Sequence, residues 1–225
     1  KPVLASNIFT GQIVNIFKNS ASISAMNYSI PSNVSVIDSN NNGFIDKVYV
    51  GDLGSQLWRV GKFTNSSGIA LKFPDCNENI HTWEAQVVFL ADSTNGRKFY
   101  YPPSLTLERG YDLLFFGTGD RENACATSTN DRFYCLREQH KSVTYSENDL
   151  VNTTDLAAPT PLLDKIGSDV NNDGREDQGW FMAASTGEKI LSENTVFYKT
   201  VYFTTFTPDG DPCVPGGLSR IYAVN

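Results

Sequence analysis

Oxygen-bearing side chains recur at a fixed spacing in two loops of the sequence. The first loop reads DSNNNGFID and offers oxygens at positions 1, 3, 5, 7 and 9. The candidate ligands are the side chains of Asp38, Asn40, Asn42 and Asp46 and the backbone carbonyl of Phe44. This spacing, with Gly43 at position 6 for the sharp bend, matches the first nine residues of an EF-hand-type calcium loop. Position 12 is Tyr49 instead of the bidentate glutamate of a helical EF-hand, so we predict a calcium loop set between β-strands.

A second loop, DVNNDGRED, repeats the same pattern, with a glycine at position 6. Its candidate ligands are the side chains of Asp169, Asn171, Asp173 and Asp177 and the backbone carbonyl of Arg175. Ordinary Asx and glycine turns explain one such run but not two runs with the same ligand spacing. We therefore predict two Ca²⁺ sites. Three carboxylates line the second loop and two line the first, so charge count favours tighter binding in the second.

We predict that the secondary structure that positions these loops is almost entirely β-strand. Short alternating or aromatic runs end at Gly, Asn, Asp or Pro, and helical periodicity is weak. Three runs look like one repeated strand, loop and strand unit: VYVGDLGSQLWRV, LLFFGTGD with RFYCLRE, and VYFTTFTPDG with LSRIYAVN. In the third unit Thr195 to Thr205 is expected to be one strand, paired with Ser219 to Val224. Such repetition predicts a β-propeller of about three blades with long loop insertions; a β-sandwich is the alternative.

Composition excludes several classes of protein. The chain has 225 residues and a net charge of −7, and its 18 Lys and Arg are scattered, with Arg97-Lys98 as the one adjacent pair. A nucleic-acid partner is therefore not expected, and no run approaches the roughly 20 apolar residues of a membrane-inserted helix. The chain begins at Lys1 without a methionine, which suggests that a leader, a tag or a larger N-terminal region was removed.

The four cysteines are even in number and form no CxxC pair, which favours disulfides in an oxidising compartment. Cys125 and Cys135 flank a short polar loop within one hairpin unit, so we predict that they pair. Cys76 and Cys213 would then pair by elimination.

Three segments of the chain are distinctive. They are DSNNNGFIDKVYVGDLGSQLWRV, FFGTGDRE with RFYCLRE, and the terminal GWFMAASTGEKILSENTVFYKTVYFTTFTPDGDPCVPGGLSRIYAVN with its DPC and GG elements. These segments resemble the PilY family of type IV pilus assembly and adhesion factors. The similarity runs in order from about Ile23 to Asn225. It implies a modified C-terminal β-propeller whose calcium loop governs pilus extension and retraction, at the outer surface or pilus tip. It also implies minor pilin partners and adhesion to a host or abiotic surface. The second loop is not expected in every member.

Enzymatic chemistry is poorly represented. His81 and His140 stand alone, without HExxH or a neighbouring cysteine, and are expected on the surface or in loops. The sequence contains no GxSxG, and no helix follows GTGD. We therefore expect no enzyme. A quinoprotein dehydrogenase stays open as an alternative because VYVGDLGSQLWRV also resembles its repeats. A free-standing carbohydrate-binding or adhesive module is a further one, with Trp83, Tyr100 and Tyr101 as candidate stacking residues.

The number of predicted hairpin units falls short of a closed ring. Propellers contain about four to eight blades, and the final strand, LSRIYAVN, has no obvious mate in the chain. We read residues 1–225 as a single propeller-type domain fragment. In it, residues 1–22 are the end of a preceding blade and residues 23–225 the PilY-like C-terminal blades. N-terminal blades, or a separate chain, would complete the fold.

Overall fold

A computed structural model of the chain describes residues 2–7, 9–62, 80–92, 96–154, 167–209 and 216–225. It is an all-β structure of several sheets, as the sequence predicted, with two short 3₁₀ turns, η1 (Ile80–Thr82) and η3 (Glu147–Asp149). No described helix has the length and hydrophobicity needed to cross a bilayer.

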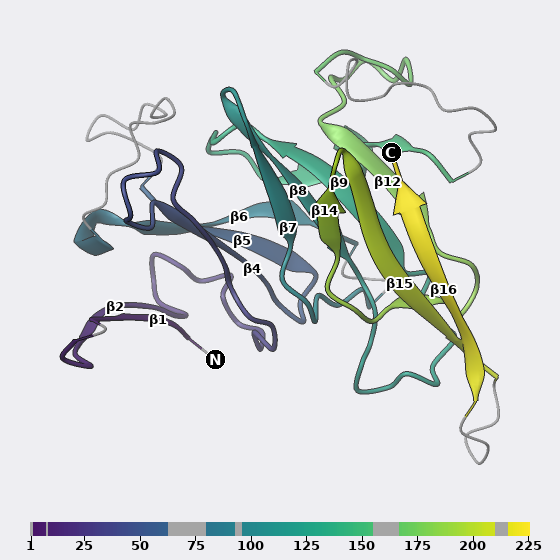
Figure 1. Ribbon diagram of the computed structural model, residues 1–225, viewed down its shortest axis with the longest axis horizontal. Coiled ribbons are helices and arrows are strands. Elements are labelled where there is room, and N and C mark those ends of the chain that lie inside the picture. Colours follow the sequence, from purple (N-terminus) through teal and green to yellow (C-terminus); the bar gives the residue numbers. More distant parts are fainter. Residues whose placement is uncertain (1, 8, 63–79, 93–95, 155–166, 210–215) are drawn as a thin grey trace.

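Four sheets, numbered I to IV in chain order, stand one after another (Figure 1). Sheet I is the hairpin β1 (Val3–Ser6) and β2 (Ile13–Phe17). Sheet II has the order β10-β6-β5-β4-β3, from β3 (Ser35–Ile37), β4 (Lys47–Gly51), β5 (Gln56–Gly61), β6 (Glu84–Leu90) and β10 (Tyr145–Ser146). Sheet III has the order β11-β12-β9-β8-β7, from β7 (Ser104–Glu108), β8 (Tyr111–Gly117), β9 (Arg132–Glu138), β11 (Val151–Asn152) and β12 (Gly179–Ala183).

Sheet IV is built on β15 (Thr200–Pro208). One edge of β15 pairs with β13 (Lys189–Ile190) and β14 (Thr195–Phe197), and the other pairs with β16 (Gly217–Val224). The single strand predicted over Thr195 to Thr205 is wrong, because the chain turns at Tyr198 and Lys199, both with positive φ, and divides it into β14 and β15. The expectation that the last strand lacks a mate is also wrong, because β16 pairs with β15 over eight residues.

The predicted repeat is present as three antiparallel hairpins, β4–β5, β8–β9 and β15–β16. In sheets II and III the hairpin continues into a further antiparallel strand, β6 or β12. The far edge of that strand is then covered by a two-residue parallel strand, β10 or β11. Each of these two sheets is therefore a four-stranded meander with a short fifth strand, which is the architecture of a propeller blade.

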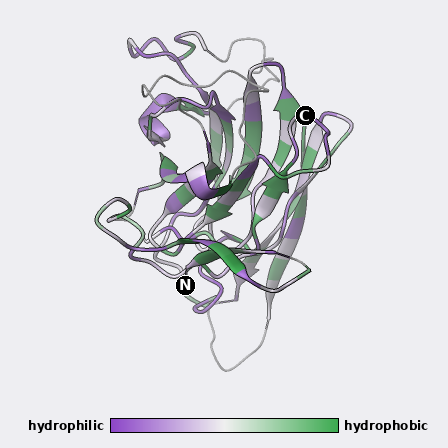
Figure 2. Cartoon of the chain, turned by 90° about the vertical axis from the view of Figure 1, so that its left-hand side faces the viewer, coloured by the Kyte–Doolittle hydropathy of each residue, from purple (hydrophilic) through white to green (hydrophobic). Residues whose placement is uncertain are grey.

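Hydrophobic residues recur along the strands (Figure 2), and their buried side chains form clusters between successive sheets. Successive side chains of a strand point to opposite faces of its sheet. Along β8, Leu114 and Phe116 face sheet II, whereas Leu113 and Phe115 face sheet IV. A strand buried on both faces needs apolar residues at consecutive positions, which accounts for the unbroken run LLFF. Aromatic rings dominate these layers, and Phe133 of β9 stacks on Phe203 of β15 with ring centroids 3.8 Å apart.

Glycines at equivalent positions of sheets II and III let a neighbouring segment approach closely. Gly51 ends β4 and Gly117 ends β8. A methyl group on Gly51 would lie 2.4 Å from the Phe99 side chain, and one on Gly117 would lie 2.5 Å from Ile190. The two glycines are therefore required by close packing.

The predicted Cys125–Cys135 disulfide is not formed. Cys135 lies fully buried in β9 between sheets III and IV, whereas Cys125 is exposed in the β8–β9 loop, and both are free thiols. The prediction failed because it used chain separation alone, whereas the strand fixes the Cys135 side chain in the apolar layer. The predicted Cys76–Cys213 pair lies outside the described residues.

Thiol labelling of the native protein should therefore modify Cys125 and spare Cys135. Burial raises the pKa of the Cys135 thiol well above its ordinary value, so the reactive thiolate is scarce as well as inaccessible. Iodoacetamide labelling followed by peptide mapping checks this, with a urea-unfolded sample as the control in which both sites react. Recovery of a peptide linked through Cys125 and Cys135 would contradict it.

Candidate functional site

The first predicted calcium loop connects β3 to β4, so it is inserted between strands as the sequence indicated. Its backbone curls around the side chain at position 1. The Asp38 carboxylate accepts from the N–H groups of Asn42 at 3.1 Å and Gly43 at 2.7 Å. Asn41 and Gly43 adopt the left-handed conformation, with φ of 57° and 91°. These two positive φ values produce the bend that gathers the oxygen-bearing side chains on the inside of the loop.

Asp46, at position 9 of this loop, is completely buried. One of its oxygens, Oδ2, accepts from the Ser39 N–H at 2.5 Å, but the other, Oδ1, is buried without a hydrogen-bond partner. A buried carboxylate oxygen without a donor is costly. It is the kind of oxygen that a cation would satisfy, so the donor set fits a hard ion such as Ca²⁺.

The second loop adopts the same conformation. The Asp169 carboxylate accepts from the N–H groups of Asp173 at 3.0 Å and Gly174 at 2.9 Å. Asn172 and Gly174, at positions 4 and 6 as in the first loop, have φ of 60° and 87°. At position 9, Asp177 is buried and accepts from the Val170 N–H at 2.8 Å. The two loops therefore share their turns and their internal hydrogen bonds as well as their sequence pattern.

The loops differ at position 9. The second oxygen of Asp177 accepts from the Asn171 amide at 3.2 Å, whereas the corresponding oxygen of Asp46 has no partner. They also differ in placement, because the second loop leads into β12 instead of joining two strands of a meander. Val170 of this loop packs against the apolar layer between sheets III and IV.

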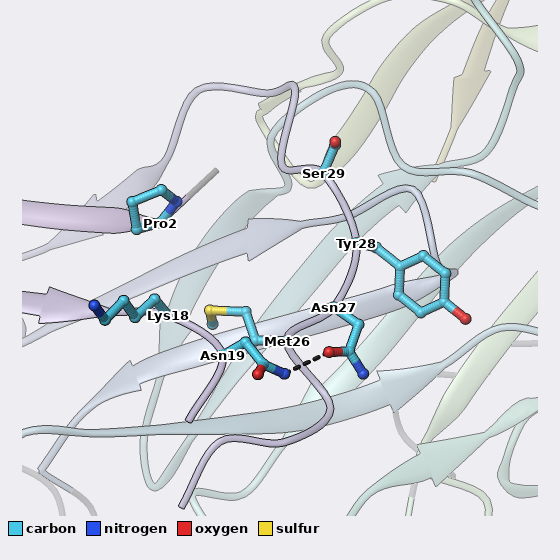
Figure 3. A pocket seen from close by; sticks show the side chains of 7 residues that line it. All are labelled: Pro2, Lys18, Asn19, Met26, Asn27, Tyr28 and Ser29. Atoms are coloured by element: carbon cyan, nitrogen blue, oxygen red, sulfur yellow. Dashed lines mark hydrogen bonds between the residues drawn. The ribbon is translucent and has the colours of Figure 1, made fainter. Parts of the chain in front are cut away.

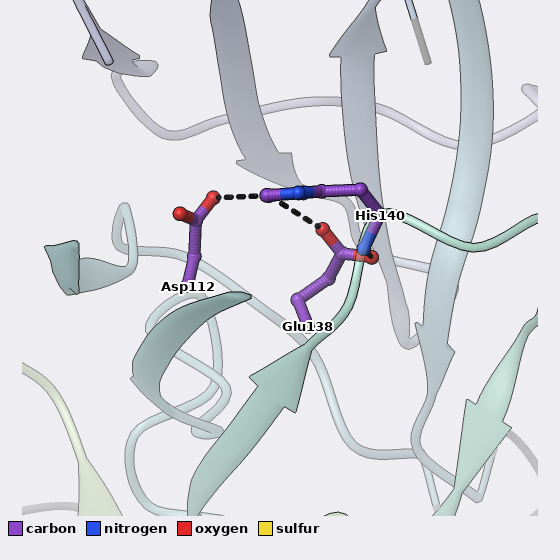
Figure 4. A group of neighbouring side chains, drawn as sticks. All are labelled: Asp112, Glu138 and His140. Atoms are coloured by element: carbon purple, nitrogen blue, oxygen red, sulfur yellow. Dashed lines mark hydrogen bonds and ion pairs between the residues drawn. The ribbon is translucent and has the colours of Figure 1, made fainter. Parts of the chain in front are cut away.

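A second cluster of chemistry-bearing side chains lies buried between sheets II and III (Figure 4). Asp112 of β8, Glu138 of β9 and His140 bring a potential ligand atom each to within 4.8 Å of one another. His140 Nε2 lies 3.1 Å from Asp112 Oδ2 and 3.7 Å from Glu138 Oε2. His140 lies in the loop that follows β9, which is one of the two expected positions, but it is buried and not on the surface. Its φ of 58° is in the left-handed region.

Two cations from sheet II already neutralise these carboxylates. Lys47 Nζ lies 2.6 Å from Asp112 Oδ2, and Arg59 Nη1 lies 2.6 Å from Glu138 Oε1. The Tyr49 hydroxyl lies 2.8 Å from Asp112 Oδ2 and 2.8 Å from Glu138 Oε2, so its single proton is shared between the two carboxylates. Burial and the two neighbouring carboxylates raise the Tyr49 pKa well above its usual value, so the phenol stays a donor. We therefore interpret these side chains as a structural link between the two blades. They are called the intersheet network below: Lys47, Tyr49, Arg59, Asp112, Glu138 and His140.

Other features that could mark an enzyme are weak. The pocket lined by Pro2, Lys18, Asn19, Met26, Asn27, Tyr28 and Ser29 (Figure 3) contains no carboxylate, histidine or cysteine. Trp83 and Tyr100, considered above as ligand-stacking residues, are buried in the fold. The other histidine, His81, lies in η1 and is exposed.

The stacked antiparallel meanders define a β-propeller-type domain, and comparisons with known proteins agree with that class. No family model matches the chain. The structure resembles the crystal structure of the Pseudomonas aeruginosa PilY1 C-terminal domain with a TM-score of 0.69 and 18% identity, over 100% of this chain and 52% of that one. In sequence, the chain is 27% identical to the type IV pilus biogenesis factor PilY1 of P. aeruginosa strains PAO1 and PAK.

The sequence similarity covers 84% of this chain and spans about a fifth of the relatives' length, 20%. Together with the shared fold, it supports the resemblance carried by the sequence motifs. The chain is therefore similar in sequence to PilY1 and shares the fold of the PilY1 C-terminal domain.

Proposed function

We propose that this chain is a calcium-binding, non-enzymatic component of type IV pilus biogenesis. It would act at the cell surface or pilus tip, regulate pilus extension and retraction, and support adhesion. The similarity to a type IV pilus biogenesis factor supports the pilus role. The two loops with matched geometry, and above all the buried Asp46 oxygen without a donor, support calcium binding.

Calcium would act on the fold through the residues that follow the first loop. Asp46 is followed directly by Lys47, the first residue of β4 and a member of the intersheet network. A cation bound to Asp38 and Asp46 would neutralise their charge and fix the start of β4. Binding to the folded state alone stabilises it by about 2.7 kcal/mol when free calcium is 100 times the dissociation constant. Calcium loss would then loosen a surface that a partner contacts.

The partners follow from the same assignment. The chain matches about half of the solved PilY1 domain, and we propose that N-terminal blades of a larger propeller complete it. Sheet I, at the other end of the stack, would be the end of a preceding blade. Minor pilins and a host or abiotic surface are the proposed external partners. The negative net charge of −7 disfavours nucleic acid as a partner.

Calorimetric titration with Ca²⁺ should give two sites per chain in the native protein. Asp38→Ala and Asp169→Ala should each remove one site, because position 1 is both a ligand and the anchor of the loop turns. Glu122→Ala, which removes an exposed carboxylate outside both loops, is the matched control and should leave two. Unchanged stoichiometry in either loop variant would remove that loop from the proposal.

The pilus role needs a cellular test. Deleting the gene should reduce the number of surface pili, and complementation with the native gene should restore it. Complementation with the Asp38→Ala gene should restore the protein at the surface but not the normal balance of extension and retraction. Pilus counts unaffected by the deletion would overturn the pilus assignment and leave the calorimetric result standing.

A further inference from the structure

The last strand, β16, differs in its surroundings from the two strands that occupy the same place in the repeat. β5 and β9 are the second strands of the β4–β5 and β8–β9 hairpins, and β16 is the second strand of β15–β16. β5 lies between β4 and β6, and β9 lies between β8 and β12. Within the described part of the chain, β16 pairs with β15 alone. Figure 1 shows it at the outer edge of the last sheet.

Burial shows the same contrast. Nearly every residue of β5 and β9 is buried, whereas most of β16 is exposed. Leu218 and Ile221 are 52% and 81% exposed. An exposed strand of eight residues without proline, and with Arg220 as its one charge, lacks most of the features that protect natural sheet edges.

The ladder between β15 and β16 fixes which backbone groups face outward. Thr204 of β15 donates its N–H to Ser192 Oγ at 3.1 Å, on the side away from β16, so it does not bond its partner Ile221. In an antiparallel pair, bonded and non-bonded positions alternate, and the register of this pair has no shift. The N–H and C=O groups of Ser219, Ile221 and Ala223 therefore point to the open edge.

We propose that this edge of β16 binds a further β-strand from the propeller portion of the same protein that lies outside residues 1–225. The inference rests on the proposed larger propeller, and nearly half of the solved relative's domain lies beyond the part matched by this chain. The incoming strand occupies the place that β6 and β12 take in sheets II and III. It bonds the backbone of Ser219, Ile221 and Ala223, so the last blade is completed by backbone pairing.

The side chains of sheet IV indicate the character of that strand. On one face, Tyr222 and Val224 pack at the margin of the apolar layer between sheets III and IV. Tyr222 is stacked on Phe203, with centroids 5.0 Å apart. A strand beside β16 that extends this layer carries apolar residues at alternate positions on the same face.

Residue-resolved amide hydrogen exchange of chain 1–225 and of the full-length protein tests the proposal. In chain 1–225, the amides of Arg220 and Tyr222, which point to β15, should be protected, and those of Ser219, Ile221 and Ala223 should exchange freely. In the full-length protein the second set should slow by about 100-fold or more. Free exchange of these amides in the full-length protein would overturn the proposal. Concentration-dependent protection in the full-length protein would also overturn it, because a second copy would then cover the edge.

Proline variants provide an independent arm. Ala223→Pro removes an outward N–H and leaves the bonds to β15 in place, so it should spare chain 1–225 and expose the amides of Ser219 and Ile221 in the full-length protein. Arg220→Pro, which removes an N–H facing β15, is the matched control and should destabilise both. Equal protection in the full-length native and Ala223→Pro proteins would contradict strand addition. A compact full-length propeller with an unprotected β16 edge would defeat this inference alone and leave the larger propeller intact.

Discussion

Glu138→Leu is expected to lower the free energy of unfolding by about 3–5 kcal/mol, the usual cost of removing one partner of a buried ion pair. Glu138 is completely buried and satisfies three donors. Its Oε1 accepts from Arg59 Nη1 and the His140 N–H at 2.6 and 2.7 Å, and its Oε2 accepts from the Tyr49 hydroxyl at 2.8 Å. Leucine fills a similar volume but leaves a buried guanidinium without its carboxylate.

Urea denaturation followed by tryptophan fluorescence measures this loss. The matched control is Glu84→Leu, which removes the partner of Lys62 in a pair whose side chains are 51% and 19% exposed. That change should cost at most about 1 kcal/mol, because water already screens the pair. The double variant Arg59→Met/Glu138→Leu should recover much of the loss, since it removes the orphaned charge. If Glu138→Leu lowers the free energy of unfolding no more than Glu84→Leu does, water reaches the intersheet network and the prediction is wrong.

The second large effect concerns pH. Burial is the main reason why the pKa of Asp131 is raised from 3.8 to about 6, and the hydrogen bond from Thr118 Oγ1 at 2.8 Å opposes that rise. The other oxygen, Oδ2, is buried without a partner. A raised pKa in the folded state means that the folded protein holds this proton more tightly than the unfolded chain does. The contribution of protonated Asp131 to the free energy of unfolding is therefore complete below about pH 4, and it is lost as the pH rises through about 6.

The size of this contribution is about 3 kcal/mol. Asp131→Asn should remove this falling slope between pH 4 and 6 and should make the variant more stable than the native protein above pH 6. Urea titrations at several pH values measure both effects. A stability profile of Asp131→Asn parallel to that of the native protein would contradict the assignment.

Asp120→Asn is the contrasting control. Burial alone would raise the pKa of Asp120, but the hydrogen bond from the Lys98 ammonium at 2.8 Å and further donors lower it. A lowered pKa contributes stability that is present above the unfolded-state pKa and is lost as the pH falls. The Asn variant should therefore lose stability at neutral pH, opposite in sign to Asp131→Asn.

The sequence by itself determined the features that depend on local spacing. The three hairpins follow from short apolar runs separated by turn residues, and the chain has an all-β fold with them in the predicted places. Both loops have the curled backbone that their Asx and glycine residues favour, because the bonds that shape them join residues at most seven apart. Calcium binding itself stays a prediction.

The tertiary structure alone decided what depends on contacts between distant segments. The burial of His140 and Cys135 was not predicted, because it is set by packing between sheets, which no local pattern records. The intersheet network joins Lys47 and Arg59 to carboxylates more than 60 residues away in the chain, at Asp112 and Glu138. Strand order also escaped the sequence, because the short parallel strands β10 and β11 have too few residues to form a pattern. Their pairing is fixed only when the longer strands present an edge.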